Sequence, residues 1–248
     1  MKASLCILGL LFAPVVHAET YIVPVDGVVE SLFRTSWSAF LHITNPHDTA
    51  VRVHVDAVFP RAPQPRCVVT PDFDLPGHST TLLIGSSFCE DYFNTLEAFQ
   101  FTTSESVIPV LDVRWSDAFK TNLQSVPVAN SWLPANRAIA VTRIQNAGGT
   151  RTNLLLVNPN ATPLEVRYRK LFDPMAGEYL VVVPPQTLLL QPILGSEFAC
   201  PEVFIPEIPV DVTCGLSVRA NQTFYVGASV IANETNDAIF RPPSVLPE

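Results

Sequence analysis

Thiol chemistry is the first possibility, because four cysteines follow the N-terminal segment: Cys67, Cys89, Cys200 and Cys214. Thiols can bind zinc, act as nucleophiles or form disulfides. A zinc site is not expected, since the chain has no Cys-x-x-Cys pair and no nearby His-x-x-x-His motif. An even number of cysteines in an exported chain predicts disulfides, and the simplest of the three possible pairings joins Cys67 to Cys89 and Cys200 to Cys214. A cysteine nucleophile would require one of the four to be unpaired.

Histidines could supply acid–base or metal chemistry, and all four beyond the N-terminal segment fall between residues 42 and 78. They are His42, His47, His54 and His78. Imidazole titrates near neutral pH and is a common metal ligand. The chain contains an internal repeat, described below, whose second copy has Asn160, Arg167 and Gln186 in place of the last three. Those are ordinary surface residues, so we expect solvated surface histidines here.

Oxygen-based chemistry has equally weak signals. Asp48-Thr49-Ala50 is close to the Asp-Thr-Gly of aspartic proteases, but the repeat has Ala161-Thr162-Pro163 there, so no second carboxylate can share a proton. A β-turn is the expected role. No Gly-x-Ser-x-Gly elbow is present. Residues 233–237 offer oxygens of the kind that calcium prefers, although a polar loop is the simpler interpretation. We therefore expect no catalytic residue, no metal, no cofactor and no enzymatic activity.

Aromatic residues give the most specific binding hypothesis. Five of them belong to the first copy and lack aromatic counterparts in the second wherever the alignment is firm: Trp37, Phe40, Tyr92, Phe93 and Trp115. Aromatic side chains gathered on a surface can stack on sugars or anchor a protein partner. Burial in the core is the alternative. We treat these five as a predicted binding patch.

The first eighteen residues, MKASLCILGLLFAPVVHA, predict a secretory signal at 1–18 that is cleaved after Ala18. Lys2 precedes an apolar run from Leu5 to Val16, and small side chains stand before the cleavage point. A bilayer-spanning helix needs about 20 apolar residues, and this run is shorter. We expect an exported protein, periplasmic or extracellular, with no membrane span after cleavage.

The charge of the mature chain limits its partners. Without Lys2 it has 14 basic and 23 acidic residues, a formal charge of −9, and no basic cluster. Nucleic acid and anionic lipid are therefore not expected as partners. A protein or polysaccharide of the envelope or extracellular space remains, and the oligomeric state is not indicated by the sequence.

An internal repeat organises the mature chain. Residues 33–59 and 150–172 each run Arg-Thr, an apolar strand, Asn-Pro, a polar turn and a strand of alternating character. The repeated residues are Arg34, Asn45 and Pro46 in the first copy, and Arg151, Asn158 and Pro159 in the second. Residues 51–56 and 164–169 alternate apolar and polar side chains, which is typical of half-buried antiparallel strands. We expect both arginines to serve mainly the structure of an open sheet end.

The repeat predicts two domains, at 19–132 and 136–248. Strands expected near every ten residues, 23 prolines and no sustained 3.6-residue periodicity favour antiparallel β-sandwiches. Helix should be sparse, with residues 87–93 as the best candidate. The linker is short and apolar, which predicts a fixed angle between the domains with Trp132 packed at their junction.

This paired pattern resembles the tandem immunoglobulin-like β-sandwich repeats of exported, mostly uncharacterised bacterial proteins. The resemblance covers the mature chain and implies an all-β fold of two tandem antiparallel immunoglobulin-like sandwiches, and it implies no catalytic residue. The expected function is a non-enzymatic structural or adhesion-like interaction module of the envelope or extracellular space. A carbohydrate-binding module is one alternative. A periplasmic assembly chaperone is another, but its usual basic cleft between the domains is not evident in this acidic chain.

Overall fold

The computed structural model describes residues 18–30, 36–61, 72–83, 95–116, 121–144, 150–171, 173, 175, 177–193, 215–232 and 238–246. These residues form seventeen β-strands and no helix. The described part of the chain thus has no helix long and apolar enough to cross a membrane. Several predictions concern residues outside the described ranges: the four cysteines, Arg34, Tyr92, Phe93, the helical candidate at 87–93 and the loop at 233–237.

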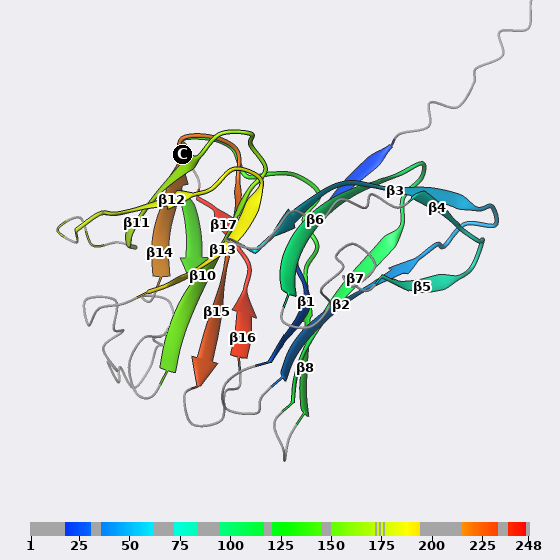
Figure 1. Cartoon of the computed structure of the whole chain (residues 1–248), viewed down its shortest axis with the longest axis horizontal. Helices are drawn as coiled ribbons and strands as arrows, with labels where there is room; N and C mark the ends of the chain where they lie inside the picture. Colours follow the sequence, from blue (N-terminus) through cyan, green and yellow to red (C-terminus); the bar gives the residue numbers. More distant parts are fainter. Residues whose placement is uncertain are drawn as a thin grey trace, which may run out of the picture.

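The first half contains eight strands in one continuous sheet (Figure 1). They are β1 (Glu19–Glu30), β2 (Ser36–Thr44), β3 (Val51–Pro60), β4 (Asp72–Leu75), β5 (Thr80–Leu83), β6 (Thr95–Thr103), β7 (Ile108–Ser116) and β8 (Thr121–Val126). Most of β1 pairs with β6, while its C-terminal end pairs with β2. Strand β1 therefore joins a β4-β3-β6-β1 layer to a β5-β2-β7-β8 layer.

The second half consists of two separate sheets, of orders β12-β11-β14-β9-β17 and β13-β10-β15-β16. The strands are β9 (Ile139–Thr142), β10 (Thr150–Asn158), β11 (Leu164–Lys170), β12 (Tyr179–Val183), β13 (Thr187–Pro192), β14 (Gly215–Ala220), β15 (Tyr225–Ala232), β16 (Ala238–Arg241) and β17 (Ser244–Val245). In Figure 1 the two halves lie beside each other, each with its own strands.

Side-chain alternation explains why these segments form strands. Along β3, Val51, Val53 and Val55 are fully buried, whereas Arg52 and His54 are exposed. Strand β11 shows the same pattern, with its apolar residues buried and its charged residues exposed. A period of two brings every second side chain to the same face of a strand. The predicted alternation of both segments is confirmed.

All pairings between the named strands are antiparallel, and the structure supports an all-β, sandwich-like fold. An immunoglobulin constant domain places its first, second, fifth and fourth strands in one sheet. Here most of β1 lies beside β6, while β2 lies beside β7 in the other layer. The strand order therefore differs from the immunoglobulin order, although the layered architecture agrees with the prediction.

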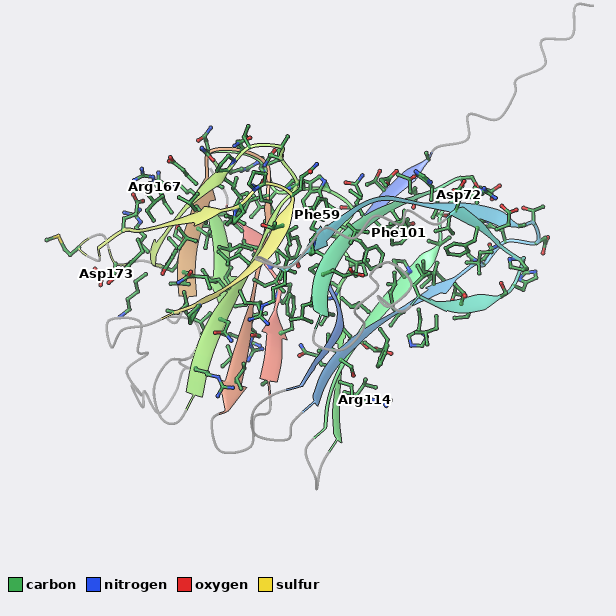
Figure 2. All side chains as sticks on the ribbon, viewed as in Figure 1. Phe59, Asp72, Phe101, Arg114, Arg167 and Asp173 are labelled. Atoms are coloured by element: carbon green, nitrogen blue, oxygen red, sulfur yellow. The ribbon has the colours of Figure 1, made fainter. Side chains whose placement is uncertain are left out.

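The two halves share a hydrophobic cluster at their junction. Leu155, Leu188 and Tyr225 of the second half belong to the same buried cluster as the core of the first half. Trp132 packs edge-on against Phe59 with ring centroids 5.5 Å apart, and Figure 2 shows Phe59 between the halves. The prediction that Trp132 packs at the junction is confirmed.

Polar contacts also join the halves. The Gln124 side chain of β8 donates from Nε2 to the Phe240 carbonyl at 2.9 Å and accepts from the Phe240 N–H at 2.7 Å. Arg61, directly after β3, forms an isolated β-bridge with Leu188 of β13. A second bridge joins Leu133 of the linker to Phe224, the residue before β15. A side-chain amide thus satisfies the backbone of β16 much as a neighbouring strand would.

Candidate functional site

The repeated asparagines hold turns. Asn45 is fully buried, and its Nδ2 lies within hydrogen-bonding distance of the carbonyls of Thr49 (2.8 Å), Leu75 (2.9 Å) and Pro76 (3.1 Å). Its Oδ1 accepts from the His47 N–H at 2.9 Å. One side chain thereby fixes the turn after β2 to the end of β4.

Asn158 makes the same set of contacts in the second half. Its Nδ2 donates to the carbonyls of Thr162 (2.9 Å), Val183 (3.1 Å) and Pro184 (2.9 Å), and its Oδ1 accepts from the Asn160 N–H at 2.9 Å. Because Asn45 and Asn158 make equivalent hydrogen bonds to backbone carbonyls in the two halves, the role of both side chains is in the fold. The prolines that follow, Pro46 and Pro159, stand at the surface end of the same turns.

The four histidines are distributed over separate carboxylates. His47 lies 3.5 Å from Glu105, and His78 lies 2.7 Å from Asp48. His54 contacts Asp72 at 3.0 Å, while His42 is 3.8 Å from Asp112. Among the described residues, no group of three or more His, Cys, Asp or Glu side chains is arranged to hold a metal ion.

His78 has a structural reason for its position. Its backbone has a positive φ of 51°, and Gln186 in the corresponding turn has a φ of 50°. The His78 N–H donates to the His47 carbonyl at 3.1 Å, as the Gln186 N–H donates to Asn160 at 3.1 Å. The two turns are therefore built alike, whatever side chain they carry.

The predicted aromatic patch is only partly described. The backbones of Trp37 and Trp115 are register partners on β2 and β7. Phe40 is half-buried opposite Asp112, and it alternates with the fully buried Ala39 and Leu41. Three positions separate Trp37 from Phe40, so these two positions belong to opposite faces of β2. The register thus brings Trp37 and Trp115 together and separates Phe40 from them.

The predicted strand-start arginine of the second copy, Arg151, lies half-buried in β10 opposite Ile231 of β15. It stands at the end of the sheet where β10 begins. This position agrees with an arginine at a sheet end.

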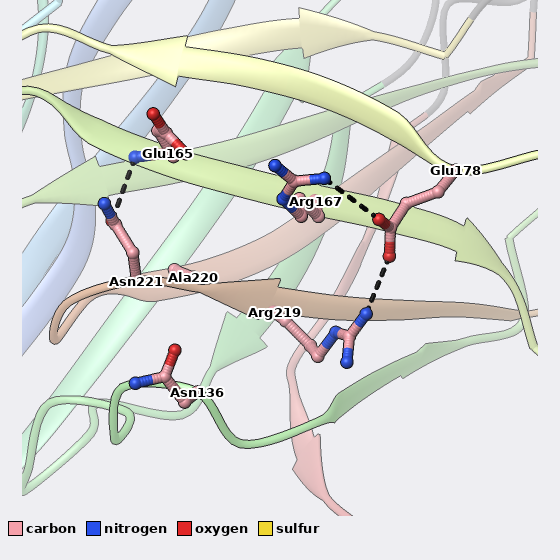
Figure 3. A pocket seen from close by; sticks show the side chains of 7 residues that line it. All are labelled: Asn136, Glu165, Arg167, Glu178, Arg219, Ala220 and Asn221. Atoms are coloured by element: carbon pink, nitrogen blue, oxygen red, sulfur yellow. Dashed lines mark hydrogen bonds and ion pairs between the residues drawn. The ribbon is translucent and has the colours of Figure 1, made fainter.

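A polar pocket of about 390 Å³ lies on the second half (Figure 3). Arg167 of β11 and Arg219 of β14 are direct register partners, and both donate to Glu178, at 3.2 Å and 2.8 Å. Asn136, Glu165, Ala220 and Asn221 complete the lining. Two like charges on opposed positions destabilise a sheet unless an anion bridges them, and Glu178 provides that anion.

The charges in this pocket satisfy one another. Hydrogen bonds from Arg219 and Arg167 hold the pKa of the Glu178 carboxyl below its ordinary value. Both arginines are half-exposed, and such exposed pairs contribute little to stability individually. The arrangement is a surface ion-pair network that could at most hold a small polar ligand.

An exposed apolar face lies on the first half. Side chains of the β5-β2-β7-β8 layer that point away from the core include Leu82 (43% exposed), Ile108 (54%), Val110 (37%) and Leu123 (61%). Leu82, His42 and Val110 form one row across β5, β2 and β7, and Ile108 is in the next row beside Thr44. We call this surface the β5-β2-β7-β8 face. In the sequence this face is indicated by residues 107–111, where the inward-facing and the outward-facing positions are both apolar.

The corresponding layer of the second half, β13-β10-β15-β16, has its outward face covered. Leu155, Val157, Leu188, Tyr225 and Phe240 are buried there in the cluster shared with the first half. A face of this layer can therefore dock onto another β-sandwich. The β5-β2-β7-β8 face has no such cover among the described residues.

Comparison with protein-family models, with curated proteins and with solved structures finds no match.

Proposed function

We infer that the mature chain is two tandem copies of one β-sandwich unit, which is like an immunoglobulin domain in its two antiparallel layers but has a strand order of its own. The order β12-β11-β14-β9 corresponds strand for strand to β4-β3-β6-β1, and β13-β10-β15-β16 corresponds to β5-β2-β7-β8. The matching hydrogen bonds of Asn45 and Asn158 support the same inference. An architecture of this kind supports many functions, so the function must be argued from a surface.

We propose that this is an exported, non-enzymatic interaction module whose β5-β2-β7-β8 face binds a protein of the envelope or extracellular space. The observation that carries the proposal is the group of exposed aliphatic side chains on that face, of which Leu82, Val110 and Ile108 lie in the same or neighbouring rows. Contiguous exposed apolar surface marks interaction sites in soluble proteins. The polar residues among them, such as His42 and Thr44, fit a surface that is also exposed to water in the unbound state.

A protein partner fits this face better than a polysaccharide. Sugars are bound chiefly by stacking on aromatic rings, whereas the exposed residues here are Leu, Ile and Val. Carbohydrate binding therefore remains the second candidate, carried by the register pair Trp37 and Trp115. An assembly chaperone is less well supported, because Arg167 and Arg219 are engaged by Glu178 on an outer sheet surface.

The test measures binding of envelope proteins and polysaccharides to immobilised mature protein. Leu82→Asp with Ile108→Asp should abolish the capture of a specific protein, while Val245→Asp, at an exposed site of the second half, should leave it unchanged. Identical capture by all three proteins would contradict the proposed face. Retention of a polysaccharide by the double variant would favour the carbohydrate alternative.

A further inference from the structure

Two corresponding strands, β4 and β12, end their sheet layers. Strand β4 pairs with β3, and β12 pairs with β11, and in each case the other side has no strand partner among the described residues. An edge strand presents unpaired N–H and C=O groups that another strand can bind. Strands β4 and β12 therefore occupy equivalent edge positions in the two halves.

Their outward side chains differ in one respect. Strand β4 carries Asp72 opposite His54 and Asp74 opposite Arg52. At the corresponding register positions β12 carries Leu180, 52% exposed, and Val182, 53% exposed. Figure 2 shows Asp72 near the far edge of the first half.

The consequence concerns edge-to-edge pairing. Charged residues on an edge strand prevent it from pairing with another strand, and proline does the same. Strand β4 has two carboxylates in four residues, so two β4 edges would repel each other. The five residues Tyr179–Val183 of β12 include neither a charge nor a proline. Strand β12 thus lacks the charges that protect the corresponding edge strand β4.

We propose that β12 pairs with the β12 of a second copy of this chain, antiparallel about a two-fold axis at Val181. In this register Leu180 faces Val182 of the partner in both directions, and Tyr179 faces Val183. All five residues of the strand find an apolar partner. Backbone hydrogen bonds then extend β12-β11-β14-β9-β17 into one continuous sheet across the dimer.

The sequence of the strand selects this register and this partner. A shift by two residues would place Glu178 opposite Val182, and Glu178 is already held by Arg167 and Arg219. A two-fold contact is isologous, so both edges are consumed and assembly stops at the dimer. Strand β12 is therefore complementary to the β12 strand of a second copy.

Sedimentation velocity of the mature chain over a concentration series provides the first test. The unaltered protein should dimerise, and Leu180→Asp with Val182→Asp should weaken dimerisation by about a hundredfold or more, because the new carboxylates face each other across the axis. Leu123→Asp on β8 replaces an equally exposed residue and should leave the dimer intact. Circular dichroism and thermal unfolding check that each variant is folded.

Cross-linking tests the axis itself. Opposed Cα atoms of antiparallel strands lie about 4.5 or 5.5 Å apart, and both separations permit a disulfide. Val181→Cys should thus give a covalent dimer on brief oxidation, whereas Leu123→Cys and the unaltered chain should not. A monomeric unaltered protein, a dimer that survives the double Asp variant, or equal cross-linking of both cysteine variants would each overturn the proposal.

Discussion

Asn158 shows how much of this fold depends on single polar side chains. It is fully buried, its Nδ2 lies within hydrogen-bonding distance of three backbone carbonyls, and its Oδ1 accepts from one backbone N–H. A buried polar group without a partner costs more free energy than a hydrogen bond contributes. The repetition of these contacts around Asn45 explains why the Asn-Pro pair could be recognised in both copies.

Replacing Asn158 should destabilise the second half. We expect Asn158→Ala to lower the free energy of unfolding by about 3 kcal/mol, because several buried carbonyls lose their donor. Urea denaturation measures this difference. Gln191→Ala, which removes an exposed hydrogen bond to the adjacent Pro192 carbonyl, serves as the control. A loss as small as that of the control would contradict the structural role of Asn158.

The stabilisation by Glu178 should depend on pH. Hydrogen bonds from Arg219 and then Arg167 lower its pKa in the folded state, so the contribution is present above the ordinary glutamate pKa and is lost as the pH falls through the folded-state value. Glu178→Gln should therefore lower the melting temperature at neutral pH and match the unaltered protein in strong acid. Glu165→Gln is the control, and a pH-independent difference would contradict the ion-pair explanation.

At the scale of the element, alternation of apolar and charged residues was sufficient to predict β3 and β11, and the Asn-Pro pairs predicted the turns that precede them. The neighbours of each strand could not be predicted in the same way. Pairing of β2 with β7 joins segments far apart in the chain, and no local pattern encodes it. The binding prediction had the same weakness, because a cluster of aromatics in the sequence does not say which face of a strand each occupies, as Trp37 and Phe40 show.

The acidic edge of the first half can be converted into the apolar edge of the second. Asp72→Leu with Asp74→Val would give β4 the residues of β12 at the same positions. If the carboxylates protect the edge, the variant should form species larger than those of the unaltered chain, as measured by light scattering after size exclusion. The single variant Arg52→Gln, which removes the arginine that pairs with Asp72 and Asp74 but leaves both carboxylates in place, should not. Unchanged assembly of the double variant would show that other features protect β4.

At the scale of the whole molecule, the two halves form one structure because the outward face of β13-β10-β15-β16 is buried against the first half. Trp132 contributes its ring and a hydrogen bond from Nε1 to Gln100 at 2.8 Å. Domains joined by a large apolar interface lose the relative motion that is otherwise expected. The β5-β2-β7-β8 face and the β12 edge are consequently held at fixed positions on one body.

This rigidity predicts cooperative unfolding. Calorimetry should show one transition for the unaltered chain and two for the variant that combines Gln124→Ala with Trp132→Ala. The first change removes the hydrogen bonds to the Phe240 N–H and carbonyl. The second removes the Trp132 ring from the apolar cluster at the junction. Leu123→Ala, the exposed neighbour of Gln124 on β8, should keep the single transition. Two transitions in the unaltered protein would mean that the halves fold independently, and the surfaces on them would then act as separate modules joined only by the linker.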